Sequence, residues 1–259
     1  LRLGCRTLAN ELNPVASVIL DATLNYPARF GSELVKDIET WGKTLLKNLD
    51  DKISHLFPES KIPPEEMQRL KDHMSRCDTS ITDFDQESIM DYIYARQVTC
   101  PHCGGEAPLL YTSWLSKVDG NLWGVSVITD GKKRNGTVRF KTYRVATGKG
   151  PNGEDPDFST VRGGKGLCVH CGQGIDAEEI KRQARGESEH GKWKDRLYAV
   201  AAVRHQPKLD KNGCVQRVKS GKRAGEIKTE KVRFFRPPNE RDLAALDEAE
   251  RMLKENWTR

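Results

Sequence analysis

The stretch CPHCGGE at residues 100–106 returns in almost the same form as CVHCGQG at residues 168–174. Each copy has two cysteines separated by two residues, and a glycine follows the second cysteine at once. Such a Cys-x-x-Cys turn presents two sulfur atoms from one knuckle, and glycine tolerates the backbone conformation that the tight turn needs. The repeat therefore predicts that two loops, far apart in the chain, meet at one point of the fold.

Four thiols in this pattern favour a zinc ion. The chain has seven cysteines and no visible secretory signal, so we expect a reducing, cytoplasmic compartment, where clustered thiols usually hold metal. A site with four thiolates leaves no position for a catalytic water, so the zinc would organise the fold. A redox-active dithiol or a chance repeat of the motif is the alternative. The predicted ligands are Cys100, Cys103, Cys168 and Cys171.

The remaining histidines and cysteines near this pattern are expected to stay outside the site. His102 and His170 each precede the second cysteine of a knuckle, and either could replace a thiol as ligand. Because four thiols are available, we expect both rings at the surface. Cys5, Cys77 and Cys214 have no partner at metal-ligand spacing and are expected to be core or surface thiols.

Basic charge is concentrated in two segments of the chain. Residues 131–150 carry seven Lys or Arg and no acid, and residues 204–236 carry eleven against three acids. This concentration suggests an anionic polymer as partner, held by salt-sensitive contacts that do not depend on base sequence. Two solvated β-ribbon tips explain the charge equally well. The candidate nucleic-acid contacts are Lys132, Lys133, Arg134, Arg139, Lys219, Lys222 and Arg223.

Length and composition suit a soluble globular protein. The 259 residues are enough for one large or two modest domains, with 36% hydrophobic and 31% charged residues. No apolar run approaches the roughly 20 residues that span a bilayer. The chain begins with LRLGC and ends with NWTR, neither of which opens or closes an obvious element, so we expect a fragment of a longer polypeptide.

The first thirty residues predict a strand, a sharp turn and a helix. RTLANEL at residues 6–12 has strand character, Asn13 is a good N-cap, and Pro14 suits the first helical position. The helix is expected to stop at Pro27. This is half of a doubly wound α/β unit, and Glu11 lies where such folds bind the ribose of a nucleotide-type cofactor. An exposed glutamate near a helix N-terminus, favourable for its charge alone, is the equal alternative.

Further elements follow from hydrophobic spacing. Residues 32–57 predict a helix whose apolar stripe should pack in a core, at Leu34, Ile38, Trp41, Leu45, Leu49, Ile53 and Leu56. Helices are also predicted around 67–77, 86–91, 175–186 and 240–257, the last capped by Asn239 with help from Asp242. Strands are predicted at 92–99, 121–130, 137–145, 193–206 and 230–238, with the second and third forming a hairpin, and a loop at 150–166.

The quoted motifs, taken together, resemble a known family. LRLGC followed by ELNPVASVILDATLNYPARFG at residues 11–31 is similar to adenine-specific DNA methylases that contain a zinc ribbon. YARQVTCPHCGGEAPL at 94–109 and GLCVHCG at 166–172 resemble the inserted ribbon of that family. The family usually has Asp where this chain has Glu11, a conservative departure that keeps the carboxylate.

The resemblance implies a partial Rossmann-like α/β methyltransferase with an inserted β-rich zinc ribbon, α+β overall in this chain. The implied domains are 1–95, a βα unit with a helical segment; 96–185, the zinc ribbon with its basic hairpin; and 186–259, a basic β-rich segment with a C-terminal helix. It also implies S-adenosylmethionine as cofactor, contacted by Glu11 and Asn13, and methyl transfer to the exocyclic amine of adenine in DNA. A prokaryotic host-defence or restriction-modification setting, with other defence subunits as partners, rests on resemblance alone.

Two parts of such an enzyme are missing from the sequence. There is no glycine-rich cofactor loop and no Asp/Asn-Pro-Pro-aromatic turn, because residues 61–64 and 236–239 have the prolines without the flanking groups. No catalytic residue is therefore assigned, and the chain alone is expected to be inactive. Two other readings stay open: a non-enzymatic zinc ribbon that binds nucleic acid, and a protein-interaction role within a defence complex.

Overall fold

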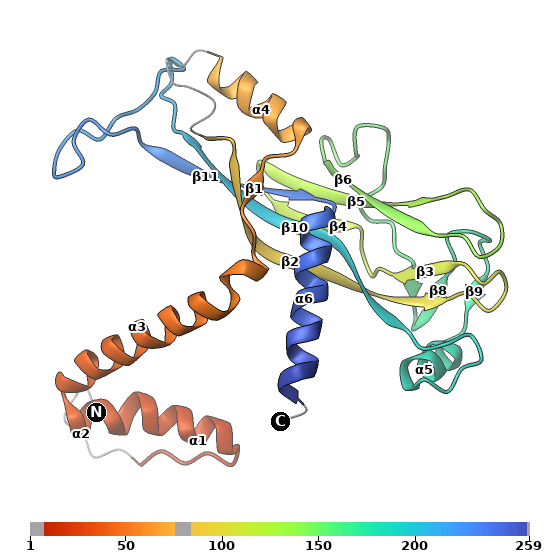
Figure 1. Ribbon diagram of the computed structural model, residues 1–259, viewed down its shortest axis with the longest axis horizontal. Helices are drawn as coiled ribbons and strands as arrows, with labels where there is room; N and C mark the ends of the chain where they lie inside the picture. The colour runs from red at the N-terminus through yellow and green to blue at the C-terminus, as the bar shows by residue number, and fades with distance from the viewer. Residues whose placement is uncertain (1–7, 76–83, 258–259) are drawn as a thin grey trace. The chain divides into compact units, whose positions relative to one another are not determined.

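The computed structural model describes residues 8–75 and 84–257, and the chain divides into two compact units between His55 and Leu56 (Figure 1). Mixed helices and antiparallel sheets make the described chain α+β, as predicted. None of the described helices combines the length and apolarity that crossing a bilayer requires. Cys5 and Cys77 lie outside the described residues.

The first unit is helical. It contains α1 (Pro14–Leu20), a π-helical turn (Asp21–Asn25), α2 (Tyr26–Phe30) and α3 (Glu33–Ile53), followed at the boundary between the units by a 3₁₀ turn (Ser54–Leu56). Asn13 caps α1 as predicted, because its side chain accepts a hydrogen bond from the Val15 amide at 2.9 Å and Pro14 opens the helix. The strand predicted at 6–12 is wrong for residues 8–12, which form no strand. A strand needs a neighbour to bond with, and the described strands all pair elsewhere.

The predicted helix end at Pro27 is also wrong. The helical run continues to Gly31, whose φ of 61° ends it. Proline lacks the N–H of a helix interior and its ring crowds the preceding turn. The wider π turn, in which the Tyr26 amide bonds the Asp21 carbonyl, places Pro27 in the first turn of α2, where both defects are tolerated.

The helix α3 is confirmed, but the predicted burial of its stripe is wrong. Ile38, Trp41 and Leu45 are 61%, 73% and 60% exposed. No side chain among residues 8–55 is buried. Residues 8–53, as described, form α1 to α3 and the π turn, so no strand of this part of the unit covers the apolar face.

The second unit is built on a long antiparallel sheet. Its strands run in the order β1 (Ser60–Lys61), β2 (Gln86–Thr99), β10 (Lys194–Pro207) and β11 (Thr229–Arg236), and β3 (Glu106–Leu109) pairs with β2 beyond the path. The helix predicted at 86–91 is wrong, because these residues are the first half of β2. They pair with β10, for example Ser88 with Val203 and Asp91 with Ala201, and this ladder overrides local propensity.

Two smaller antiparallel sheets complete the unit. One joins β4 (Trp114–Val118), β5 (Asn121–Thr129) and β6 (Val138–Arg144), and it contains the predicted hairpin. The other joins β7 (Val161–Arg162), β8 (Lys165–Leu167) and β9 (Gly174–Ile175), within and just after the segment predicted as loop. Three helices, α4 (Pro64–Met74), α5 (Ala177–Arg185) and α6 (Glu240–Trp257), confirm the helices predicted around 67–77, 175–186 and 240–257, although α4 begins earlier than expected.

The core of this unit forms three clusters along the sheet. Phe234 and Leu70, both fully buried, belong to the cluster between α4 and the sheet. Val125 and Ala199 belong to a second, and Val98 to a third that also contains cysteines. At about 3.3 Å per residue, the 14 residues of β10 span roughly 45 Å. The two ends of β10 therefore belong to different regions of the unit.

Candidate metal centre and basic surfaces

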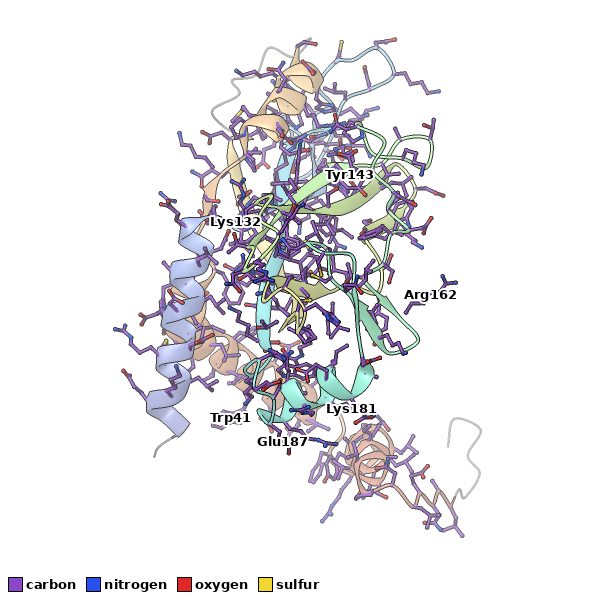
Figure 2. The ribbon with its side chains drawn as sticks, turned by 90° about the vertical axis from the view of Figure 1, so that its right-hand side faces the viewer. Trp41, Lys132, Tyr143, Arg162, Lys181 and Glu187 are labelled. Atoms are coloured by element: carbon purple, nitrogen blue, oxygen red, sulfur yellow. The ribbon has the colours of Figure 1, made fainter. Side chains whose placement is uncertain are left out.

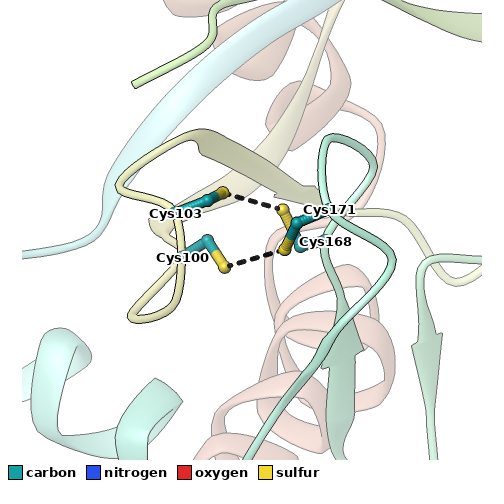
Figure 3. Close-up of side chains that lie close together, drawn as sticks. All are labelled: Cys100, Cys103, Cys168 and Cys171. Carbon is teal, nitrogen blue, oxygen red and sulfur yellow. Dashed lines mark hydrogen bonds between the residues drawn. The ribbon is translucent and has the colours of Figure 1, made fainter. Parts of the chain in front are cut away.

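The four predicted cysteines come together. Their sulfurs all lie within 4.8 Å of one another, with Cys100 3.8 Å from Cys171 and Cys103 3.6 Å from Cys168 (Figure 3). A disulfide would need about 2.05 Å. A tetrahedron with zinc–sulfur bonds of about 2.3 Å has edges of about 3.8 Å. The donor set and spacing therefore fit a tetrahedral metal such as zinc.

The two knuckles have the same backbone design. Cys100 N–H donates to Gly105 O at 2.9 Å, and Cys168 N–H donates to Gln173 O at 2.9 Å. In each knuckle, the glycine after the second cysteine returns a bond to the first cysteine's carbonyl, at 2.8 and 2.9 Å. Gly104 and Gly172 both have φ of 71°, where a side chain would be strained. The reason predicted for these glycines is thus confirmed.

Burial makes thiolates costly at this centre without a cation. Burial raises the pKa of Cys168 to about 12 and raises that of Cys100. For Cys171, burial also works to raise the pKa, but hydrogen bonds from the Gln173 backbone and the neighbouring thiols outweigh it, and the pKa is lowered. A bound dication would stabilise all four thiolates at once.

The prediction that both neighbouring histidines lie at the surface is confirmed for His102 and wrong for His170. His102 is exposed, and a ring nitrogen lies 3.3 Å from Gly174 O. His170 is half-buried instead, and both ring nitrogens are inaccessible to solvent and make no hydrogen bond with a described residue. The ring fills the space over Gly105 and Gly136, where an added Cβ would come within 2.7 and 2.5 Å of it. His170 therefore packs the hairpin tip against the knuckles.

A glutamine that the sequence did not single out completes the centre. Gln183 of α5 is fully buried, accepts from Thr99 N at 2.8 Å and donates to Thr99 O at 2.8 Å. These two bonds join α5, which follows the second knuckle, to the end of β2, which precedes the first knuckle. Only a pairing across 84 residues creates them, so local sequence patterns carry no signal for this role.

The basic hairpin tip lies against the first knuckle. Asn135 N–H donates to Cys103 O at 2.8 Å, and Glu106 N–H donates to Gly136 O at 2.9 Å. The predicted contacts Lys132, Lys133 and Arg134 occupy this tip, and Arg139 follows on β6 with an exposed side chain. Lys132 of this tip and Tyr143, near the end of β6, are both labelled in Figure 2.

The second basic segment lies elsewhere. Lys219, Lys222 and Arg223 are exposed on the loop between β10 and β11, where Arg223 pairs with Glu226 at 2.5 Å. This loop follows the carboxyl end of β10, whereas the amino end of β10 lies beside the knuckles, with Lys194 opposite Gln97. Figure 1 shows the two basic loops at opposite ends of this unit, so they do not form one surface.

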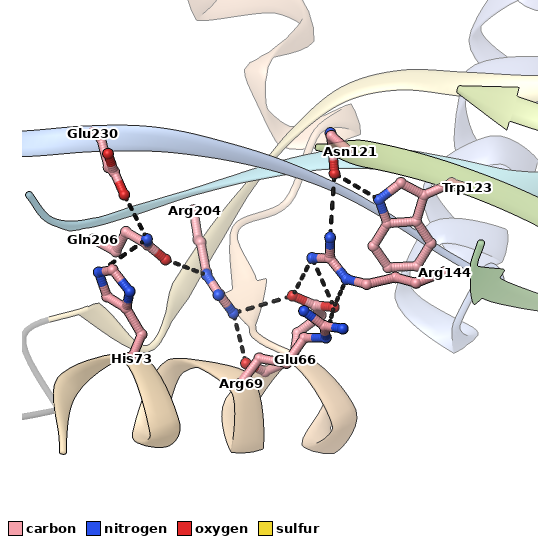
Figure 4. A network of polar contacts seen from close by, with 9 residues as sticks. All are labelled: Glu66, Arg69, His73, Asn121, Trp123, Arg144, Arg204, Gln206 and Glu230. Atoms are coloured by element: carbon pink, nitrogen blue, oxygen red, sulfur yellow. Dashed lines mark hydrogen bonds and ion pairs between the residues drawn. The ribbon is translucent and has the colours of Figure 1, made fainter. Parts of the chain in front are cut away.

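Three arginines of the basic segments are structural instead. Arg236 donates to Glu87 and Asp242, and Arg144 and Arg204 pair with Glu66 at 3.2 Å each (Figure 4). All three arginines have at most 21% of the side chain exposed. The number of basic residues in these segments is therefore larger than the number that a partner could contact.

The two predicted cofactor residues lie in the first unit. The Glu11 carboxylate accepts from the amides of Leu12 and Asn13, at 3.0 and 3.4 Å, and the Asn13 side chain caps α1. Both side chains serve the local turn, and no strand precedes them in the described residues. As placed here, they do not by themselves form a site for S-adenosylmethionine. No family model, curated protein or solved structure matches the chain.

Proposed function

We propose that the second unit is a zinc-stabilised DNA-binding unit. One observation carries this proposal: the exposed cationic tip of the β5–β6 hairpin is bonded directly to a knuckle of the four-cysteine centre. The metal would hold Lys132, Lys133 and Arg134 in place, and Arg139 would continue the surface along β6. These residues would contact phosphates rather than read bases, because exposed lysine and arginine side chains at a hairpin tip supply charge, and no element that fits a groove and reads base edges accompanies them among the described residues.

Duplex binding across ionic strength tests this proposal. We expect fluorescence anisotropy to show that log K falls linearly with log salt, with about 0.9 lost from the slope for each phosphate contact removed. Replacing Lys132, Lys133 and Arg134 by Gln should weaken binding and flatten the slope. The same changes at Lys219, Lys222 and Arg223 are the matched control. Zinc-loaded protein that does not bind duplex at low salt would contradict the proposal and favour a protein-interaction role.

We further propose that the protein containing this chain is an S-adenosylmethionine-dependent DNA adenine-N6 methyltransferase. The support is the sequence similarity of residues 1–5 and 11–31, together with that of the knuckles, to zinc-ribbon adenine methylases. When bound, the cofactor would supply the methyl group. Residues 8–257 would contribute DNA binding and zinc-dependent structure, and no step of methyl transfer is assigned to them.

The coding sequence around this chain tests the enzyme proposal. We expect an Asp-Pro-Phe-x-Gly-x-Gly motif before Leu1 and an Asp/Asn-Pro-Pro-aromatic turn after Arg259. A tritiated-methyl transfer assay on the 259-residue chain should show no turnover, whereas a polypeptide that includes both motifs should methylate adenine. Unrelated flanking sequence would contradict the enzyme proposal and leave the DNA-binding proposal standing.

A further inference from the structure

A cleft of about 630 Å³ lies between α4, β6 and the loop that follows β6. Four cationic side chains from these three elements line it, against two carboxylates. The cations are Arg69, Lys141, Arg144 and Lys149, and the carboxylates are Glu65 and Glu66. This cleft is away from the cysteines and includes none of the residues predicted to contact nucleic acid.

One carboxylate carries the charge balance at the base of the cleft. Glu66 is 5% exposed and contacts three guanidinium groups, those of Arg144 and Arg204 at 3.2 Å and that of Arg69 at 3.8 Å (Figure 4). Three positive charges therefore share one negative charge in a partly desolvated place. The Arg69 side chain is 54% exposed, whereas those of Arg144 and Arg204 are 21% and 4% exposed. Buried charges are normally paired, so two largely buried arginines that share one carboxylate leave the base of the cleft with a net positive charge.

The pKa shifts of Arg69 and Arg204 agree with this excess of positive charge. Burial and then the charge of Arg144 lower the pKa of Arg69, outweighing Glu66 and Asp72. Burial also lowers the pKa of Arg204, and Arg144 and Arg69 add to the effect although Glu66 opposes it. The nearby carboxylates of Glu65 and Asp72 are exposed, so water screens them.

The donors that remain free determine what the cleft can hold. Arg144 donates hydrogen bonds from Nε and Nη2 to Glu66 and from Nη1 to Asn121. Its guanidinium group also stacks on Trp123, 4.4 Å from the ring centre. Among the described residues, Arg69 has one ion pair, the 3.8 Å contact with Glu66, and Lys141 has none, although the charge of Lys141 helps to lower the pKa of Glu154. Lys149 has one loose contact with Asp155 at 3.9 Å. Three flexible cations are thus available above a rigid arginine.

The cleft offers no stacking surface for a base. Trp123 is 4% exposed, with Arg144 over one face and Phe235 against it at a ring distance of 5.8 Å. Recognition of single bases relies on open aromatic faces. A tetrahedral oxyanion suits the available donors better, because lysine and arginine both bind phosphate oxygens.

We propose that the α4–β6 cleft is a phosphate-binding site that takes a backbone phosphate of the bound DNA, with Arg69, Lys141 and Lys149 as direct donors. The inference rests on the proposed DNA binding. Arg139 and Lys141 are both exposed and two residues apart, so they share one face of β6. Arg144 at the end of this strand lies about 20 Å from Val138 at its start, which is the length of about six base pairs.

Two readouts on matched variants test the site. The first is the salt dependence of duplex binding, and the second is the rise in melting temperature with inorganic phosphate at constant ionic strength. Arg69→Gln and Lys141→Gln should each weaken duplex binding about fivefold, reduce the salt slope by about one, and reduce the phosphate-induced rise. Arg182→Gln is the control, because Arg182 makes the same i,i+3 contact at 3.8 Å on α5 with similar exposure.

The outcomes separate this site from the DNA-binding proposal. Loss of both readouts in the cleft variants, with Arg182→Gln unchanged, supports the backbone-phosphate site. A phosphate response that the cleft variants lose, without any change in salt slope, shows a site for free phosphate and overturns the DNA assignment. No phosphate response in wild type, with unchanged slopes in the variants, overturns the site altogether. A wild type that does not bind duplex but responds to phosphate, with that response lost in the cleft variants, refutes the DNA-binding proposal and with it the backbone-phosphate assignment, and leaves the cleft as a site for free phosphate.

Discussion

Glu66 is the counter-charge that two arginines of the second unit share. Its carboxylate pairs with Arg204, whose side chain is 4% exposed, and with Arg144, which is 21% exposed. The sequence did not indicate this role, because Glu66 lies 78 residues from Arg144 and 138 from Arg204. Arg144 and Arg204 were accordingly counted with the surface charge of the basic segments.

Removing this carboxylate should be strongly destabilising. Glu66→Ala leaves buried guanidinium groups without a counter-charge, and we expect it to lower the free energy of unfolding by ~3 kcal/mol in urea titrations. The neighbouring substitution Glu65→Ala removes an exposed carboxylate from the same helical turn and should change stability by less than ~0.5 kcal/mol. Equal, small effects of the two substitutions would show that Glu66 is not the central counter-charge.

Gly136 gives a second test at the residue scale. A Cβ at this position would lie 2.5 Å from the His170 ring, and so would push the hairpin tip from the knuckle. We expect Gly136→Ala to lower the melting temperature and to weaken zinc retention against a chromophoric chelator. Gly174→Ala is the control in the other knuckle loop, because its Cβ would meet nothing closer than 4.0 Å. If both variants kept zinc as wild type does, the packing of His170 would not matter to the centre.

Among the elements, a metal at this centre would join the loop between β2 and β3 to the loop between β8 and β9. The stability of the protein should therefore depend on pH in opposite directions with and without the metal. In metal-free protein, burial raises the pKa of Cys168 from 9.0 to about 12. The part of the free energy of unfolding that depends on this thiol is therefore at its full value below about pH 9 and is lost as the pH rises towards 12. With zinc, the folded state holds four thiolates while the unfolded chain keeps its protons, so stability rises with pH.

Thermal melting between pH 5.5 and 7.5 measures this difference. The melting temperature of zinc-loaded protein should rise by about 5 °C or more across this range, since several protons are released on metal binding. Protein stripped with a chelator and bearing Cys100→Ser should show no such metal-dependent rise. The same pH dependence in both samples would contradict thiolate ligation.

Local patterns predicted the long strand β10 at 193–206, and they also predicted several elements whose partners are near in sequence. The β5–β6 hairpin, α5 and α6 follow from alternation, helical spacing and a cap, as Asn239 and Asp242 exchange hydrogen bonds of 2.7 and 3.0 Å. The first half of β2 and the segment 8–12 were wrong because strand formation depends on a distant partner, present for β2 and lacking for residues 8–12. The contact between the two distant knuckles was predictable, because four thiolates that share one metal ion must lie close together.

At the scale of the whole molecule, the two units differ in how much apolar surface they bury. Residues 8–55 contain no buried side chain, whereas β10 is buried over most of its length. A helix that buries no apolar face is only marginally stable in water. We expect hydrogen-exchange mass spectrometry to show roughly hundredfold faster exchange for α3 than for the centre of β10. Equal protection would mean that the Ile38–Trp41–Leu45 face is covered in solution.

The central claim is that one metal ion joins the two knuckles. X-ray absorption at the zinc edge, on protein purified without added metal and analysed for its metal content, tests it most directly. We expect one zinc per chain, bound by four sulfurs at about 2.3 Å, with the signal lost in Cys100→Ser and retained in Cys214→Ser. Protein that folds without zinc, or a zinc bound by nitrogen and oxygen, would contradict it.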